Sequence, residues 1–138
     1  MSDPRALART AGEAMWADDR ASRGLGMVLE EVGVGRARLS MCVTEAMVNG
    51  HGLCHGGFIF ALADSAMAFA ANSHGERAVT QHCAVSFLRP GRHGEVLRAT
   101  ATERARAGRS GIYDVTVESE DGTVLAEFRG QTRAIGSD

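Results

Sequence analysis

The chain has 138 residues and a mass of 14.6 kDa, which predicts one domain over residues 1–138. Its 15 basic and 17 acidic residues give a formal charge of −2, which excludes an overall basic nucleic-acid surface and disfavours a polybasic membrane binder. Every basic residue is arginine, so a lysine Schiff base, a P-loop lysine and a lysine general base are excluded.

Three features of the sequence favour a cytoplasmic protein. No apolar stretch reaches transmembrane length, and the first residues lack the basic and then apolar order of a signal peptide. The 3 cysteines, an odd number without a CxxC pair, are typical of reduced thiols rather than of a disulfide framework. We therefore expect a cytoplasmic protein with neither a membrane nor a nucleic acid as partner.

The first half of the chain alternates between helical and strand-like segments. An amphipathic helix is predicted over 4–21, within an N-terminal helical segment that spans 1–24. Strands are predicted over 25–32 and 36–43, the latter with clear apolar alternation. After a loop rich in glycine and histidine at 44–57, a helix that is apolar on all sides is expected over 58–71, and such a helix is buried inside its domain.

The second half of the chain predicts four strands, over 79–88, 95–104, 112–118 and 123–133. In the first of them, simple alternation places Thr80 and His82 on the face opposite Val79 and Cys83. Strands grouped around a single buried helix indicate an α+β fold, with an antiparallel sheet wrapped around one long central helix.

Asp64 is the one acidic residue of the apolar helix. An ionised carboxylate in a dry core is costly unless it is paired or hydrogen-bonded, and the neighbouring helix positions supply no partner. The side chain therefore either bonds a distant arginine or backbone group, or faces a cleft where it acts as a base or nucleophile.

The start of the same helix is the second candidate feature. In His55-Gly56-Gly57 no side chain screens the two glycine N–H groups, and the first N–H groups of a helix have no internal partner. Such a site suits a phosphate or the oxyanion of an acyl transfer, although paired glycines at a helix start also occur as simple turns.

The spacing of these two features predicts a dimer. Asp64 follows Gly56 by eight residues, about 12 Å along a helix, so one reacting carbon cannot touch both on the same helix. Two antiparallel helices around a two-fold axis would bring Gly56 of one subunit to Asp64 of the other. We therefore expect a homodimer whose active sites are shared between chains.

Several motifs together resemble the signature of the hotdog-fold acyl-CoA thioesterases, and most closely the phenylacetic-acid-degradation (PaaI) type. The resemblance covers residues 12–136, and the motifs that carry it are NGHGLCHGG at 49–57, LAD at 62–64, FLRPG at 87–91, GIYDV at 111–115 and FRG at 128–130. It implies a hotdog fold, paired dimers that form a tetramer, and hydrolysis of aryl- or acyl-CoA thioesters without a metal or redox cofactor, because coenzyme A is part of the substrate.

The resemblance also implies roles for single residues. Asp64 matches the family's carboxylate, which is the nucleophile or general base, and Gly56 matches the glycine whose N–H polarises the thioester carbonyl. His55 and Asn49 match the histidine and asparagine that accompany them. Thr80 stands where some relatives, though not all, have a hydroxyl that positions water.

Coenzyme A carries several phosphate charges, so cations should line the mouth of the cleft. The candidates for binding the substrate are residues in turns beside predicted strands or at the helix start: Gly57, Arg89, Pro90, Arg106, Arg109 and Ser110. Each arginine could equally be a solvated surface charge.

Other readings remain open on the sequence alone. His51, His55 and Cys54 could begin a metal site, but no third ligand of suitable spacing follows, and Cys54 could be a nucleophile with a distant histidine. A non-catalytic acyl-CoA-binding module and a hotdog hydratase or dehydratase are the alternatives to a thioesterase. Within the thioesterases, medium- or long-chain acyl groups are an alternative to phenylacetyl and hydroxyphenylacetyl groups.

Overall fold

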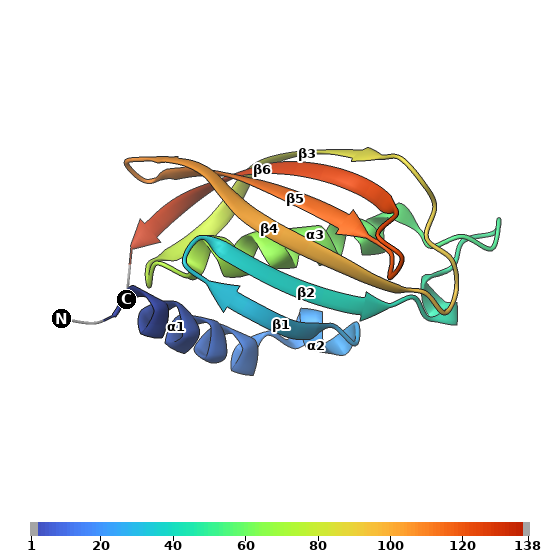
Figure 1. Ribbon diagram of the computed structural model, residues 1–138, viewed down its shortest axis with the longest axis horizontal. Coiled ribbons are helices and arrows are strands. Elements are labelled where there is room, and N and C mark those ends of the chain that lie inside the picture. The colour runs from blue at the N-terminus through green and yellow to red at the C-terminus, as the bar shows by residue number, and fades with distance from the viewer. Residues whose placement is uncertain (1–2, 137–138) are drawn as a thin grey trace.

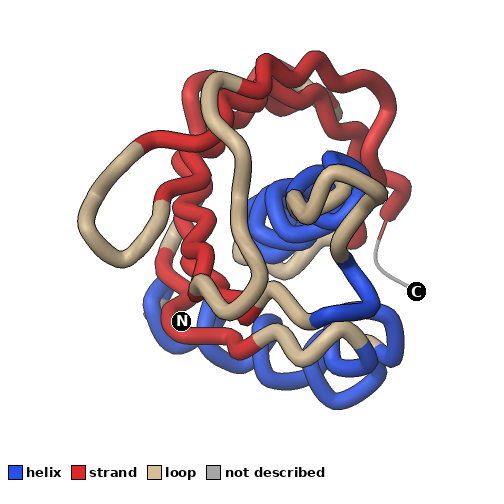
Figure 2. Tube along the Cα trace, turned by 90° about the vertical axis from the view of Figure 1, so that its right-hand side faces the viewer, coloured by secondary structure: helices blue, strands red, loops and turns tan. Residues whose placement is uncertain are grey.

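The computed structural model describes residues 3–136, in which one antiparallel sheet curves around a long helix (Figures 1 and 2). The strands lie in the order β1-β2-β4-β5-β6-β3, so β1 and β3 form the two edges. In chain order the elements are α1 (Pro4–Asp18), α2 (Arg20–Gly24), β1 (Val28–Gly33), β2 (Arg36–Cys42), the 3₁₀ turn η1 (Glu45–Met47), α3 (Gly56–Asn72), β3 (Arg77–Phe87), β4 (Val96–Ala107), β5 (Ser110–Glu118) and β6 (Val124–Gly136). The expected α+β arrangement is confirmed.

Helix α3 fills the concave side of the sheet, as its apolar sequence predicts (Figure 2). Leu62, Ala66 and Met67 on this helix are fully buried. The alternation in two strands is confirmed by the side chains that meet the helix, which are Ala37, Leu39 and Met41 of β2 and Tyr113, Val115 and Val117 of β5.

The N-terminal helical segment differs from the single helix predicted over 4–21. It is divided at Asp19, which ends α1 and caps α2 by accepting a hydrogen bond from the Ser22 N–H at 2.9 Å. Aspartate competes with helix continuation because its side chain bonds nearby backbone groups. Trp16 of α1 packs against Phe69 of α3, with ring centroids 6.0 Å apart, and this contact holds the segment on the domain.

Most element boundaries lie within a few residues of the predicted ones. Helix α3 begins at Gly56 rather than at residue 58, because His55 caps it and both glycines join the first turn. Strand β1 begins at Val28 rather than at residue 25, and strands β3, β4 and β5 each begin or end beyond the ranges that alternation predicts. Their extra residues pair with neighbouring strands, and such pairing leaves no trace in the local pattern.

A β-bulge in β3 makes the predicted division of this strand into two faces wrong for Val79 and Thr80, whereas Cys83 and Val85 share the core-facing side as predicted. The pairing of β3 with β6 shifts between Thr80 and His82, so Gln81 is an extra residue in the ladder. Thr80 therefore lies opposite the buried Thr132 and on the helix-facing side with Cys83, while Val79 is 47% exposed. The bulge turns Thr80 towards α3.

Candidate active site

His55 and the two glycines after it form the first turn of α3, but the two N–H groups are not equivalent. The His55 Nδ1 accepts a hydrogen bond from the Gly57 N–H at 2.9 Å, so the expectation that both glycine N–H groups are free is wrong for Gly57. Within residues 3–136 the Gly56 N–H has no hydrogen-bond partner. One donor is therefore left at the positive end of the α3 dipole.

The cap also fixes the tautomer of His55. Because Nδ1 accepts a hydrogen bond, a neutral His55 carries its proton on Nε2. The side chain is exposed, so this second N–H points away from the cap and is available to a ligand. His55 thus has a structural task at Nδ1 and a free donor at Nε2.

Asp64 is partly exposed on α3, and its partner comes from β3. The Thr80 hydroxyl donates a hydrogen bond to Asp64 Oδ1 at 2.9 Å. Among residues 3–136 no arginine forms an ion pair with this carboxylate, so the alternative of a distant guanidinium partner is not realised in the described chain. Burial, and secondly the charge of Asp64, raise the pKa of the nearby Cys83 thiol.

Gly56 and Asp64 lie on the same helix, two turns apart, as the sequence predicted. Their separation of about 12 Å along the axis is too large for one carbonyl group to bridge within a chain. Each chain therefore contains an N–H donor and a carboxylate of complementary chemistry that cannot act on the same atom without a second copy.

Asn49 shapes the loop before α3. Its Oδ1 accepts hydrogen bonds from the backbone N–H groups of His51 at 2.9 Å and Leu53 at 3.2 Å. The side-chain oxygen is therefore used locally, in the manner of an Asx turn, and Nδ2 remains as the donor. The loop is also hydrogen-bonded to the loop between β3 and β4, because the Cys54 N–H donates to the Gly91 carbonyl at 2.8 Å.

A cleft of about 380 Å³ opens beside Gly56. Two of the predicted substrate-binding residues, Arg89 and Pro90, lie in it, so the structure brings them to the start of α3. The full lining is Cys54, Gly56, Ile59, Phe87, Leu88, Arg89 and Pro90. Sequence reasoning did not assign Phe87 and Leu88 to the site, although their position before a turn was visible, because the strand pattern alone does not show which helix end they meet.

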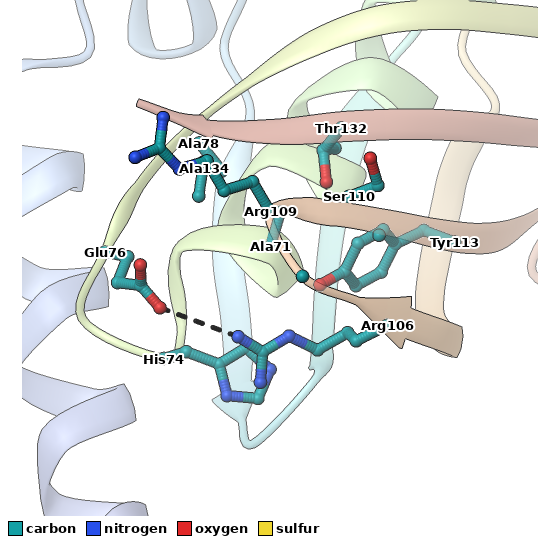
Figure 3. Close-up of a pocket in the computed structure, with 12 residues that line it drawn as sticks. Ala71, His74, Glu76, Ala78, Arg106, Arg109, Ser110, Tyr113, Thr132 and Ala134 are labelled. Atoms are coloured by element: carbon teal, nitrogen blue, oxygen red, sulfur yellow. Dashed lines mark ion pairs between the residues drawn. The ribbon is translucent and has the colours of Figure 1, made fainter. Parts of the chain in front are cut away.

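Gly57 lies in the first turn of α3, and the three remaining predicted substrate-binding residues lie elsewhere. Arg106, Arg109 and Ser110 line a second, narrow pocket at the C-terminal end of α3, together with Tyr113 and Thr132 (Figure 3). Helix α3 has 17 residues and is thus about 26 Å long, so within one chain these groups are far from Gly56. The structure therefore divides the predicted arginines between the two ends of the helix.

A polar network that the sequence did not predict adjoins the second pocket, with Glu103 at its centre. Glu103 accepts one hydrogen bond from the Tyr113 hydroxyl at 2.9 Å and pairs with His74 at 2.7 Å. Arg106 lies 3.6 Å from Glu76, and Figure 3 shows this ion pair. Burial, followed by the hydrogen bond to Glu103, raises the pKa of Tyr113 well above its usual range. The phenol is neutral, and the network connects the turn after α3 to β4 and β5.

The alternative chemistries receive no support from the geometry. Within residues 3–136 no three His, Cys, Asp or Glu side chains lie close enough to hold a metal ion. Burial raises the pKa of the Cys54 thiol, which disfavours the thiolate that a cysteine nucleophile requires. In the same part of the chain, no helix combines the length and hydrophobicity needed to cross a membrane.

Comparisons with known proteins agree on one family. Residues 51–126 match the model of the thioesterase superfamily. The acyl-coenzyme A thioesterase PaaI of Escherichia coli K12 is 42% identical over 123 residues, which cover 89% of this chain and 88% of that protein.

Solved structures give the same result. The structure of the E. coli PaaI protein from the phenylacetic acid degradation operon superposes with a TM-score of 0.96 and 38% identity, covering 98% of each chain. The more distant smu.793 of Streptococcus mutans, solved with acetyl-CoA bound, has a TM-score of 0.74 and 26% identity, and covers 80% of this chain and 88% of that one.

Proposed function

Since this chain belongs to the thioesterase superfamily and is a thioester hydrolase, we propose that it cleaves aryl- or acyl-CoA thioesters to the free acid and coenzyme A. Phenylacetyl-CoA and hydroxyphenylacetyl-CoA are the proposed substrates, because the similar E. coli protein comes from the phenylacetic acid degradation operon. The observation that carries the proposed mechanism is the presence of two groups on α3. The Gly56 N–H has no hydrogen-bond partner within residues 3–136, and the Asp64 carboxylate is hydrogen-bonded to Thr80.

In the proposed reaction these two groups have opposite tasks. The Gly56 N–H, at the positive end of α3, stabilises the oxyanion that forms on the thioester carbonyl. Asp64 either removes a proton from the attacking water or attacks the carbonyl itself to give an anhydride that water then hydrolyses. Thr80, through its hydroxyl, keeps the carboxylate oriented.

Two further donors can orient the carbonyl or the water. They are the Nε2–H of His55 and the Nδ2 of Asn49, which the local hydrogen bonds leave free. The thiolate of coenzyme A is a good leaving group, so the reaction as proposed requires neither a general acid nor a metal or redox cofactor.

We propose that the working unit is a homodimer joined through β3. This strand has 11 residues, lies at the edge of the sheet and leaves Val79 about half exposed. Such an edge is a template for pairing with another strand. A two-fold axis normal to the sheet would pair two copies of β3 antiparallel and bring Gly56 of one subunit towards Asp64 of the partner subunit. The family resemblance further suggests that two such dimers form a tetramer.

The proposed dimer would also bring the arginines from the two ends of α3 to the same substrate molecule. Antiparallel pairing places the start of one β3, beside Arg109 and Ser110, next to the end of the other, beside Arg89 and Pro90. We propose that Arg89, Arg106 and Arg109 contact the phosphates of coenzyme A, with Ser110 as a further polar contact; the Gly57 N–H, bonded to His55, is not available for this task. The thiols of the described chain are free, in keeping with a cytoplasmic protein.

A thiol-release assay tests the proposed function. The wild-type protein should release coenzyme A from a panel of phenylacetyl-, benzoyl- and alkanoyl-CoA, with the highest kcat/KM on phenylacetyl-CoA. Asp64→Asn keeps an oxygen that can accept from Thr80 but removes the base or nucleophile, so kcat should fall by about 10²- to 10⁴-fold while binding persists.

Three outcomes would contradict the proposal or part of it. Equal turnover in Asp64→Asn and wild type would remove Asp64 from the chemistry. Tight acyl-CoA binding without thiol release by the wild type would favour the non-catalytic binding module, and a preference for long alkanoyl groups would replace the proposed substrate class.

A further inference from the structure

Phe87 is a large apolar side chain that the fold leaves 50% exposed. It is the last residue of β3 and follows Cys83 and Val85, which both face α3 and pack against the core. Because β3 runs back along α3, this end of the strand meets the start of the helix. A half-exposed phenyl ring in such a place has a solvent-facing side that the fold does not use.

The ring of Phe87 lies directly against Gly56. A Cβ atom built on Gly56 would be 3.2 Å from Cζ and 3.3 Å from Cε1 of Phe87, which is tighter than ordinary van der Waals contact. Glycine is therefore the residue that fits at position 56 without displacement of the ring. The same contact places the phenyl group beside the N–H that we assign to the oxyanion.

The cleft at this point has an apolar side and a charged side. Ile59, Leu88 and Phe87 supply hydrocarbon surface, whereas Arg89 supplies a cation. A thioester carbonyl bound at Gly56 carries two substituents, the acyl group and the sulfur of coenzyme A. The phosphate-bearing arm is drawn to the arginine, so the apolar side is left for the acyl group.

We propose that Phe87 is a specificity-determining residue, whose ring packs against the first carbons of the acyl group while the carbonyl oxygen accepts from Gly56. This inference rests on the proposed function and adds the residue that selects among acyl groups. An aromatic acyl group gains offset or edge-to-face contact with the ring, which an alkyl chain does not. Phe87 therefore favours arylacetyl over alkanoyl thioesters.

The test compares Phe87→Leu with wild type on phenylacetyl-CoA and hexanoyl-CoA. Loss of the ring should lower the ratio of the two kcat/KM values by about threefold to tenfold, mainly through the aryl substrate. Val34→Ala is the control: it truncates an exposed apolar side chain in the turn between β1 and β2 that does not line the cleft, and the ratio should be unchanged. Gel filtration of each variant verifies that the oligomeric state is retained.

A double-variant cycle supplies a second readout. Gly56→Ala forces a methyl group against the ring, whereas in a Phe87→Ala background that methyl group has room. The loss of kcat/KM caused by Gly56→Ala should therefore be smaller in the Phe87→Ala protein, a non-additivity expected of residues in contact.

The outcomes separate this inference from the proposed function. A wild type that releases thiol but shows the same aryl-to-alkyl ratio as Phe87→Leu would overturn the role of Phe87 and leave the thioesterase intact. An equal fall on both substrates would likewise overturn it, since the ring would then serve folding or dimerisation. A wild type without thiol release on any CoA thioester would contradict the proposed function itself.

Discussion

At the level of single residues, position 56 combines two requirements. In the proposed mechanism its N–H must be free for the substrate carbonyl, and its lack of a side chain leaves space for the ring of Phe87. The residue before it, His55, has φ −62° and ψ 132°. This is the extended type of conformation that a residue before proline prefers, so a proline at position 56 would be compatible with it. Position 56 is also the first residue of α3, where proline is well tolerated.

Gly56→Pro should therefore remove the N–H while keeping the helix. Loss of one oxyanion donor lowers kcat by about 10²- to 10³-fold in other enzymes, and we expect a similar loss here. Gly56→Ala brings the same Cβ towards Phe87 but keeps the N–H, so its loss should be much smaller. The measurement is kcat in a thiol-release assay, and equal losses in the two variants would show that crowding, not the N–H, matters.

The capping contact of His55 is a feature that the local sequence pattern does not predict. His55 directly precedes the proposed oxyanion donor Gly56, and its Nδ1 caps α3 by accepting a hydrogen bond from the Gly57 N–H. The histidine-glycine-glycine sequence contains this possibility, because a side-chain acceptor two residues before an unpaired N–H can cap a helix. Whether it does so depends on the rotamer, and the rotamer follows from packing.

At the level of elements, the sheet holds its outer face together with cross-strand polar pairs. Asp114 of β5 and Arg129 of β6 are direct neighbours in the ladder and form two hydrogen bonds, of 2.6 and 2.9 Å. The hydrogen bond from Arg129, and then its charge, lower the pKa of Asp114. Both side chains are more than one third exposed, so the contribution of this pair to stability is small.

The sign of the pH dependence follows from that shift. The folded state binds the Asp114 proton less readily than the unfolded chain, so its stabilisation is present above the unfolded pKa of about 3.9 and is lost as the pH falls through the folded value. Asp114→Asn should lower the free energy of unfolding at pH 7 and have a smaller effect at acid pH. Urea unfolding at both pH values tests this.

The comparison requires a partner variant. Arg129→Gln should remove the same pH-dependent contribution, because the shift disappears with its cause. A destabilisation by Asp114→Asn that is the same at pH 7 and at acid pH would show that the ion pair does not contribute through its charge.

At the level of the whole molecule, the arrangement of α3 and β3 is the basis of the proposed dimer. One helix bears both Gly56 and Asp64, too far apart to meet, and the strand beside it is an open edge. Subunit complementation tests this directly. Asp64→Asn and Gly56→Pro homodimers should both be nearly inactive, whereas a mixed dimer regains one site with both wild-type groups.

Free subunit exchange should therefore restore about one quarter of the wild-type activity, because half of the dimers are mixed and each has one of two sites intact. The control replaces one partner by the Asp64→Asn/Gly56→Pro double variant, with which no intact site can form. Mixtures of the single variants that stay at the sum of their separate activities would show that both groups act within one chain.

The sequence by itself determined the architecture and provided the candidate reactive groups. Alternation over residues 37–43 and 113–117 specified which strand faces are buried, and the continuous apolar run specified the central helix, because both patterns follow from the periods of the backbone. Asp64, the carboxylate in that run, was identified as a candidate reactive group, because an ionised carboxylate in an apolar core is costly.

Only the tertiary structure decided which of these groups meet. Thr80 reaches Asp64 because a bulge reverses the facing of β3, and Arg106 and Arg109 lie away from Gly56 because their hairpin reaches the opposite end of α3. Such contacts join residues far apart in the chain, through pairing register and packing that no local period encodes. The chemistry is thus present in the sequence, and its geometry is a property of the folded sheet and helix.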